Sequence, residues 1–126
     1  MIVLSEHDVR ELLDMESCVD AMTEVLASLA RGELYNPLRS IARPEGAETL
    51  LGLMPAYRAG ESSAYGLKEI VVVPTNPARG LDTHMGGVVL HDGETGELVA
   101  LMNASLLPVQ RRVELRVPPD RDQFRG

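Results

Sequence analysis

The first third of the chain carries apolar residues at the three- and four-residue spacing of amphipathic helices. A short apolar run at residues 2–4 predicts a strand. Ser5, with Asp8 three residues later, predicts the N-terminus of a short helix. Asp14 predicts the N-cap of a second helix, which Gly32 ends. The apolar residues of that helix are Cys18, Val19, Met22, Val25, Leu26 and Leu29.

After Pro37 the pattern changes to short apolar and alternating runs bounded by Gly, Pro and Asp, which predicts strands. Pro55 predicts that the paired part of the second of these strands ends there. The turn sequence DGETGE predicts a hairpin. The predicted segments are strands at 38–43, 48–57 and 64–73 and a hairpin over 86–103. Two helices followed by a run of strands predict an α+β fold with a mostly antiparallel or mixed sheet.

Composition narrows the class of protein. A chain of 126 residues that is 44% apolar fits one domain, which we expect to bury roughly two thirds of its unfolded surface. The net charge of −7 argues against nucleic acid or anionic membrane as a partner. No apolar run approaches the roughly 20 residues of a membrane span, and the start of the chain does not resemble a signal peptide, so we expect a cytoplasmic protein.

The last residues differ from the rest. Residues 1–108 carry 7 basic and 16 acidic side chains, net −9, whereas residues 109–126 carry 5 basic and 3 acidic ones, net +2. Pro118 and Pro119 stop any regular element there. We therefore expect one unit over 1–107 and a divergent, disordered tail over 108–126.

Lys68 is the only lysine of the chain and lies in its most apolar predicted strand. Strand alternation places it on one face with Ile70 and Val72. Such a lysine either reaches water at the end of the sheet, which composition alone favours, or lies in a cleft that holds an anion. Arg39 is either a surface arginine or a fork for a carboxylate. The loop 74–84, which holds two prolines, is a connection or part of a site.

Several kinds of chemistry lack a signature. One cysteine excludes an internal disulfide and a cysteine-cluster metal site. No second ligand stands at metal-binding spacing from any of the three histidines, so we expect no metal and surface or hydrogen-bonded roles for them. Neither a dinucleotide-binding glycine motif nor a nucleophile elbow is present.

Longer stretches of sequence resemble the ornithine cyclodeaminase/mu-crystallin family. They are the N-terminal segment LSEHDVRELLDMESCVDAMTEVLASLARGE, the short runs NPLRS and GLMPAY, and the block from Gly66 to Ser105. The resemblance covers residues 1–107. It implies NAD(P)-dependent chemistry on amino acids and imines, and a substrate-binding and dimerisation domain with an inserted Rossmann domain. This chain would hold only the N-terminal segment of the first domain, without the Rossmann domain.

The resemblance also assigns residues. Arg39 and Lys68 match the pair that holds the substrate carboxylate, and Thr83 matches a threonine that contacts the nicotinamide cofactor. Arg111 falls at a third substrate-binding position, but Arg112 replaces the family's threonine beside it and the alanine-rich helix that should follow is absent. The catalytic aspartate of the cyclodeaminase belongs to the absent domain.

A further departure concerns the substrate. Ornithine-cyclising members carry a carboxylate directly before Leu-Met-Pro, where this chain has Gly52. A second ammonium group of the substrate would then lack a partner, which argues against ornithine itself.

The expected function follows from the resemblance. The intact relative would bind an amino acid or its imine and exchange hydride with NAD or NADP, either cyclising ornithine to proline or reducing an imine or keto acid, and would form a homodimer. The chain by itself is expected to bind no cofactor and to be inactive. The alternatives are a non-catalytic module for small carboxylates and a dimerisation fragment. We interpret the chain as a truncated product of a frameshift, or else as a genuine short form.

Overall fold

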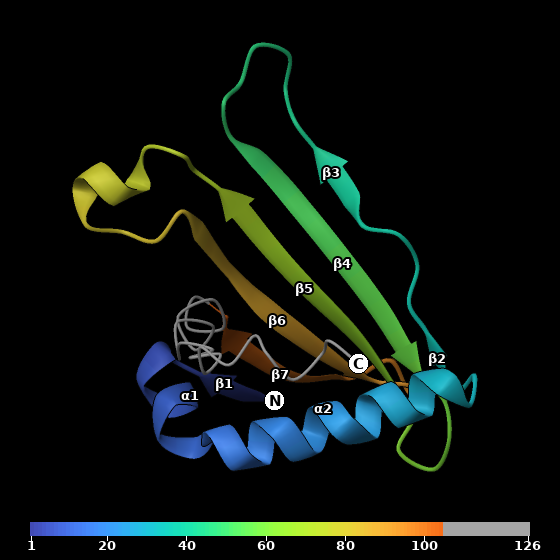
Figure 1. Cartoon of the computed structure of the whole chain (residues 1–126). Coiled ribbons are helices and arrows are strands. Elements are labelled where there is room, and N and C mark those ends of the chain that lie inside the picture. Colours follow the sequence, from blue (N-terminus) through green and yellow to red (C-terminus); the bar gives the residue numbers. More distant parts are fainter. Residues whose placement is uncertain (105–126) are drawn as a thin grey trace, which may run out of the picture.

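The computed structural model describes residues 1–104 as two helices beside one mixed β-sheet (Figure 1). Residues 105–126 lie outside the described part, and with them the expected tail and Arg111. The α+β class is confirmed. The strands are β1 (Ile2–Leu4), β2 (Leu34–Tyr35), β3 (Ser40–Ala42), β4 (Leu50–Arg58), β5 (Ala64–Val72), β6 (His84–Asp92) and β7 (Leu98–Asn103). The helices are α1 (Glu6–Leu12), α2 (Met15–Ala30) and the short 3-10 helix η1 (Asn76–Arg79).

Local hydrogen bonds explain where the two long helices begin. The Ser5 hydroxyl accepts the backbone N–H of Asp8, and the Asp8 carboxylate accepts the backbone N–H of Ser5, which completes a capping box. The Asp14 carboxylate accepts the N–H of Ser17 at 2.7 Å and starts α2. Both caps confirm the positions predicted from sequence.

The sheet has the order β1-β7-β6-β5-β4-β2, with β3 also paired to β4. Its centre is a continuous antiparallel ladder of three nine-residue strands, β4, β5 and β6. The hairpin of β6 and β7 follows as predicted, with a bulge after Leu90. β1 adds to the far side of β7 in parallel, the one parallel pairing in the described residues. The sequence pattern predicted neither this pairing nor β2.

The prediction that strand pairing ends at Pro55 is wrong. Pro55 lies within β4 and is paired with Leu67 of β5, and the ladder runs on to Arg58. On its other side, β4 pairs with β3 over residues 51–53 and with β2 over 57–58. Residues 54–56 therefore have no partner on that side, so a missing N–H costs no ladder bond there.

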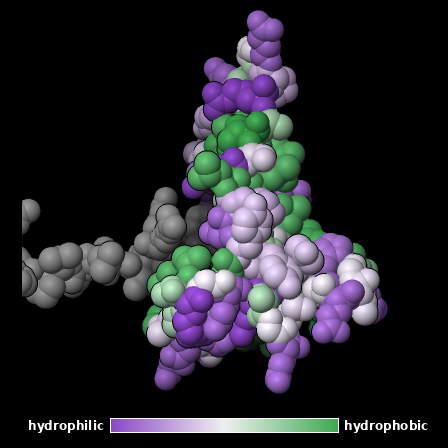
Figure 2. Space-filling view, turned by 90° about the vertical axis from the view of Figure 1, so that its right-hand side faces the viewer, coloured by the Kyte–Doolittle hydropathy of each residue, from purple (hydrophilic) through white to green (hydrophobic). Residues whose placement is uncertain are grey.

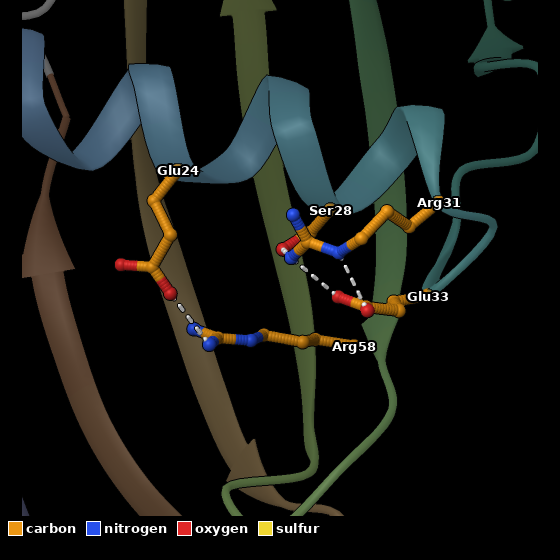
Figure 3. Close-up of polar contacts among 5 residues, drawn as sticks. All are labelled: Glu24, Ser28, Arg31, Glu33 and Arg58. Carbon is orange, nitrogen blue, oxygen red and sulfur yellow. Dashed lines mark hydrogen bonds and ion pairs between the residues drawn. The ribbon is translucent and has the colours of Figure 1, made fainter.

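Polar contacts attach the C-terminal half of α2 to the end of β4 (Figure 3). Arg58 Nη2 of β4 lies 2.8 Å from Glu24 Oε1 of α2. Arg31 donates to Glu33 at 2.7 Å and to the hydroxyl of the buried Ser28 at 3.0 Å. These contacts place α2 across the strands on the face to which Arg58 points (Figures 1 and 3).

The described part has little deeply buried apolar surface, less than the core expected from the length of the chain. Its buried apolar residues are Val9, Ala100 and Ala104. Several apolar residues of α2 are exposed, such as Leu26 at 59%. Two helices cannot cover both faces of a seven-stranded sheet, which is the physical reason. The view onto the β3 side shows a band of hydrophobic surface below the polar tip of the β3–β4 loop (Figure 2). No described helix is long and apolar enough to cross a membrane.

Candidate functional site

Lys68 lies at the middle of the central strand of the sheet. Its neighbours across the strands are Met54 of β4 and Val88 of β6. Val88 in turn opposes Met102, which opposes Leu4. Directly opposed residues share a face, so this row defines one face of the sheet, which we call the lysine face. Arg58 belongs to it as well, because it stands four residues from Met54 along β4.

The surroundings of Lys68 suit an anionic ligand. The side chain is half-buried, and its ammonium group makes no ion pair or hydrogen bond within residues 1–104. One neighbouring row on the lysine face consists of Ala56, Gly66, Leu90 and Ala100. A Cβ built on Gly66 would meet nothing within 4 Å, which leaves space over the sheet beside the lysine. An unpaired, half-buried ammonium group is costly unless something neutralises it.

Arg39 is exposed and stands directly before β3, so the predicted strand 38–43 is shorter than expected. The first residue of β3, Ser40, opposes Leu53. Extending this register by one residue sets Arg39 opposite Met54, the partner of Lys68. Arg39 and Lys68 would then lie two strand spacings apart, about 10 Å between Cα atoms. Both side chains are long enough to reach one carboxylate between them.

Thr83 lies away from this pair. It stands in a bend directly before β6, and its carbonyl accepts the N–H of Val73 at 2.8 Å. Val73 is five residues along the sheet from Lys68, about 16 Å. The Thr83 side chain is half-buried, and its hydroxyl makes no hydrogen bond within the described part of the chain. A single small substrate cannot contact both Lys68 and Thr83. A substrate at Lys68 with a dinucleotide bound beside it could contact the two residues together.

The histidines that the structure describes in this region show no arrangement typical of catalysis or metal binding. The backbone N–H of the exposed His84 donates to Asp82, and His91 Nδ1 lies 3.1 Å from the carbonyl of Gly96. In residues 1–104 no three His, Cys, Asp or Glu side chains gather as a metal site would require. Arg111 lies outside the described residues.

Lowered carboxyl pKa values occur at turns and caps rather than at the lysine face. The backbone N–H of Thr95 is the main cause that holds the pKa of Asp92 below its usual value. The hydrogen bond from Arg31 does the same for Glu33. Each of these carboxylates stabilises a local structure.

One hollow, of about 210 Å³, opens on the face opposite the lysine face. There Leu53, Glu69, Gly87 and Asn103 form a row that we call the glutamate face. Its lining residues are Val3, Leu4, Glu69, Gly87, Val88, Val89, Leu101, Met102 and Asn103. Gly87 has no side chain between Glu69 and Asn103, which produces the depression. Sequence reasoning missed this hollow, although the glycine pair at 86–87 was a possible signal.

The sequence of this chain is similar to a known protein family and to individual members with known activities. The family model described as the ornithine cyclodeaminase/mu-crystallin family matches residues 1–113, a range that includes Arg111. A Delta(1)-pyrroline-2-carboxylate reductase of Bacillus cereus is 31% identical over 111 residues, which are 88% of this chain and 34% of that protein.

Solved structures agree in fold. The Delta(1)-pyrroline-2-carboxylate reductase of Thermococcus litoralis, in complex with NADH and L-proline, superposes with a TM-score of 0.79 at 28% identity and covers 88% of this chain and 34% of that one. A lysine cyclodeaminase that recognises L-lysine, L-ornithine and L-2,4-diaminobutyric acid has a TM-score of 0.70 at 34% identity, covering 88% of this chain and 35% of its own.

The chain thus spans about a third of the length of its relatives. The matched third includes both helices, the sheet and every described candidate residue. On the match over residues 1–113, the chain belongs to the ornithine cyclodeaminase/mu-crystallin family.

Proposed function

We propose that this chain is the carboxylate-binding part of an NAD(P)-dependent enzyme that acts on an amino acid or its imine. Lys68 would neutralise the substrate carboxylate, and Arg39 would add a second cationic group from the segment directly before β3. Holding the carboxylate fixes the α-carbon, which is the positioning that hydride exchange at that carbon requires. Within the family we favour imine or keto-acid reduction over ornithine cyclisation, because Gly52 offers no carboxylate for a second ammonium group.

The unpaired Lys68 ammonium is the observation that carries the proposal. It stands half-buried on the lysine face, without a partner in residues 1–104, beside positions occupied by glycine and alanine. A lysine that merely reached solvent would need no such small neighbours. The relatives support the ligand class, since one was solved in complex with L-proline and another recognises L-lysine, L-ornithine and L-2,4-diaminobutyric acid.

The nicotinamide cofactor would accept or supply hydride when bound. From the described residues, Thr83 is the group that fits a role beside it, because its hydroxyl is free of internal hydrogen bonds. No dinucleotide-binding motif is present in the chain, so the chain alone would bind the cofactor weakly or not at all. We therefore expect no NAD(P)-dependent turnover by these 126 residues, and spectrophotometric detection of turnover would contradict this.

Calorimetry with L-proline and with pyrrole-2-carboxylate, a planar imine mimic, tests the carboxylate site. Lys68→Met should weaken binding about tenfold to a hundredfold, the equivalent of a hydrogen bond to a charged group of about 1.5–3 kcal/mol. Arg39→Met should weaken binding less, because Arg39 is exposed. Arg43→Met is the matched control, since Arg43 is also exposed and without a partner in the described structure.

The outcomes separate the candidate functions. Binding that is lost in Lys68→Met and kept in Arg43→Met supports the carboxylate site. Equal affinity in all four proteins would refute it and favour a dimerisation fragment.

A homodimer is part of the proposal. A solved archaeal alanine dehydrogenase relative, 30% identical with a TM-score of 0.77, is a dimer with bound NAD. The exposed apolar residues of the described part are consistent with further association. Sedimentation equilibrium should give twice the chain mass, and a monomer at all concentrations would refute this part.

A further inference from the structure

The two ends of the loop that joins β5 to β6 are hydrogen-bonded to each other. At its mouth, the N–H of Val73 donates to the carbonyl of Thr83 at 2.8 Å. Inside it, the chain turns through η1 and then through Gly80, whose φ of 71° is left-handed. The loop is therefore a compact unit with bonded ends rather than an open connection.

Asn76 lies at the centre of this loop and is one of its most connected residues. The residue is only 6% exposed. Its backbone N–H donates to the carbonyl of Val73 at 3.1 Å, and its own carbonyl accepts the N–H of Leu81 at 3.1 Å. Its side-chain Nδ2 donates to the carbonyl of Asp82 at 2.9 Å. One buried residue thus joins the first half of the loop to the second.

The hydrogen bond from the Asn76 side chain restrains the backbone next to Thr83. It ends on the carbonyl of Asp82, the residue directly before Thr83. The Thr83 carbonyl is fixed separately by Val73. The backbone is therefore held on both sides of the Thr83 side chain, while its hydroxyl stays free of hydrogen bonds in the described structure. Pro74 and Pro77 restrict the backbone locally, but they cannot tie the two halves of the loop together.

We propose that Asn76 is a positioning residue that holds Thr83 in the orientation it presents to a ligand. Only the identity of that ligand, a nicotinamide cofactor, rests on the proposed function. The hold on Thr83 is a property of the free chain, so it is testable without any ligand. Sequence reasoning did not single out Asn76, because an Asn-Pro pair is an ordinary turn signal.

The test uses nitrogen-15 relaxation and amide exchange on the whole 126-residue chain. Asn76→Ala removes the donor, and Asn76→Asp keeps the shape of the side chain but replaces the donor with an acceptor at neutral pH. We expect amide exchange at Leu81 and Val73, whose N–H groups donate to the carbonyls of Asn76 and Thr83, to rise at least tenfold in both variants, with rates around Lys68 unchanged. Asn36→Ala is the control, since Asn36 is exposed and has no hydrogen bond in the described residues.

A direct signature completes the experiment. In the parent chain, a scalar coupling across the hydrogen bond should link the Asn76 side-chain nitrogen to the Asp82 carbonyl carbon. The proposal is overturned if Asn76→Asp leaves Thr83 as ordered as in the parent, since shape alone would then suffice. It is also overturned if exchange rises equally around Lys68, which would indicate general destabilisation.

The two proposals fail separately. Failure of L-proline to bind would overturn the carboxylate site and leave the Thr83 measurements unaffected. Unchanged Thr83 order in the Asn76 variants would overturn the positioning role and leave carboxylate binding unaffected.

Discussion

Gly86 is the position at which one added methyl group should do most damage to the sheet. It lies in β6 opposite Ile70 of β5. A Cβ built on Gly86 would collide with the backbone carbonyl oxygen of Glu69 and stand 2.8 Å from the Cα of Ile70. Both obstacles are backbone atoms, so rotation of a side chain cannot relieve the collision. In Gly86→Ala, β5 and β6 must move apart.

The expected cost follows from two contributions. Forcing an extra methyl group into a packed site costs about 1–3 kcal/mol. Separating the ladder at this point weakens one or two backbone hydrogen bonds, each worth about 1 kcal/mol. We expect Gly86→Ala to lower the free energy of unfolding by about 2–4 kcal/mol, a large share of the roughly 5–15 kcal/mol typical of a domain.

Gly66 provides the matched control in the same ladder. It lies in β5 opposite Ala56 and Leu90, and a Cβ there would meet nothing within 4 Å. Gly66→Ala should be neutral or stabilise the chain by up to about 1 kcal/mol, because alanine loses less backbone entropy on folding. Urea unfolding followed by circular dichroism measures both variants. If the free energies of unfolding of the two variants agree within about 0.5 kcal/mol, the prediction that β5 and β6 are too close at Gly86 to admit a methyl group is refuted.

Three further predictions concern local structure. The pKa of Asp92 is lowered in the folded chain, mainly by the N–H of Thr95, so its contribution is present above the unfolded pKa near 3.8 and is lost as pH falls through the lower folded value. Asp92→Asn should therefore flatten the dependence of Tm on pH below about pH 4, and an unchanged slope would contradict this. Ser5→Ala should cost about 0.5–2 kcal/mol of unfolding free energy through loss of the cap of α1; a loss below about 0.3 kcal/mol in urea unfolding would speak against the capping box. A double-mutant cycle on Glu24 and Arg58 should give a coupling of at most about 1 kcal/mol that salt weakens, since both side chains are half-exposed.

The parts of the fold that depend on neighbouring residues could be predicted from the sequence. The caps at Ser5 and Asp14 and the turn between β6 and β7 are each determined within a few residues. The role of Pro55 was predicted wrongly, because it depends on which segments pair with the other side of β4. The parallel partner of β1 was missed for the same reason.

The candidate site, too, was predicted from the sequence only in part. Lys68 stands out by composition, but residues alone favoured a solvent-reaching lysine, and only the resemblance to a family made it a carboxylate-binding candidate. The structure adds the pairing that brings Met54 beside Lys68, and it places Arg39 directly before the first paired residue of β3. The burial of Asn76 and its bond to the Asp82 carbonyl depend on how the loop closes, which no spacing of residues reveals.

The parallel pairing of β1 with β7 has a consequence for the order in which the protein can assemble. Ile2–Leu4 is made before the other described strands and pairs with Ala100–Met102, which are made almost a hundred residues later. The antiparallel ladder between them closes through short connections and can form without it. Contacts so distant in sequence are slow to form. Until synthesis passes β7, Ile2 and Val3 remain unpaired apolar residues that a chaperone could bind during translation.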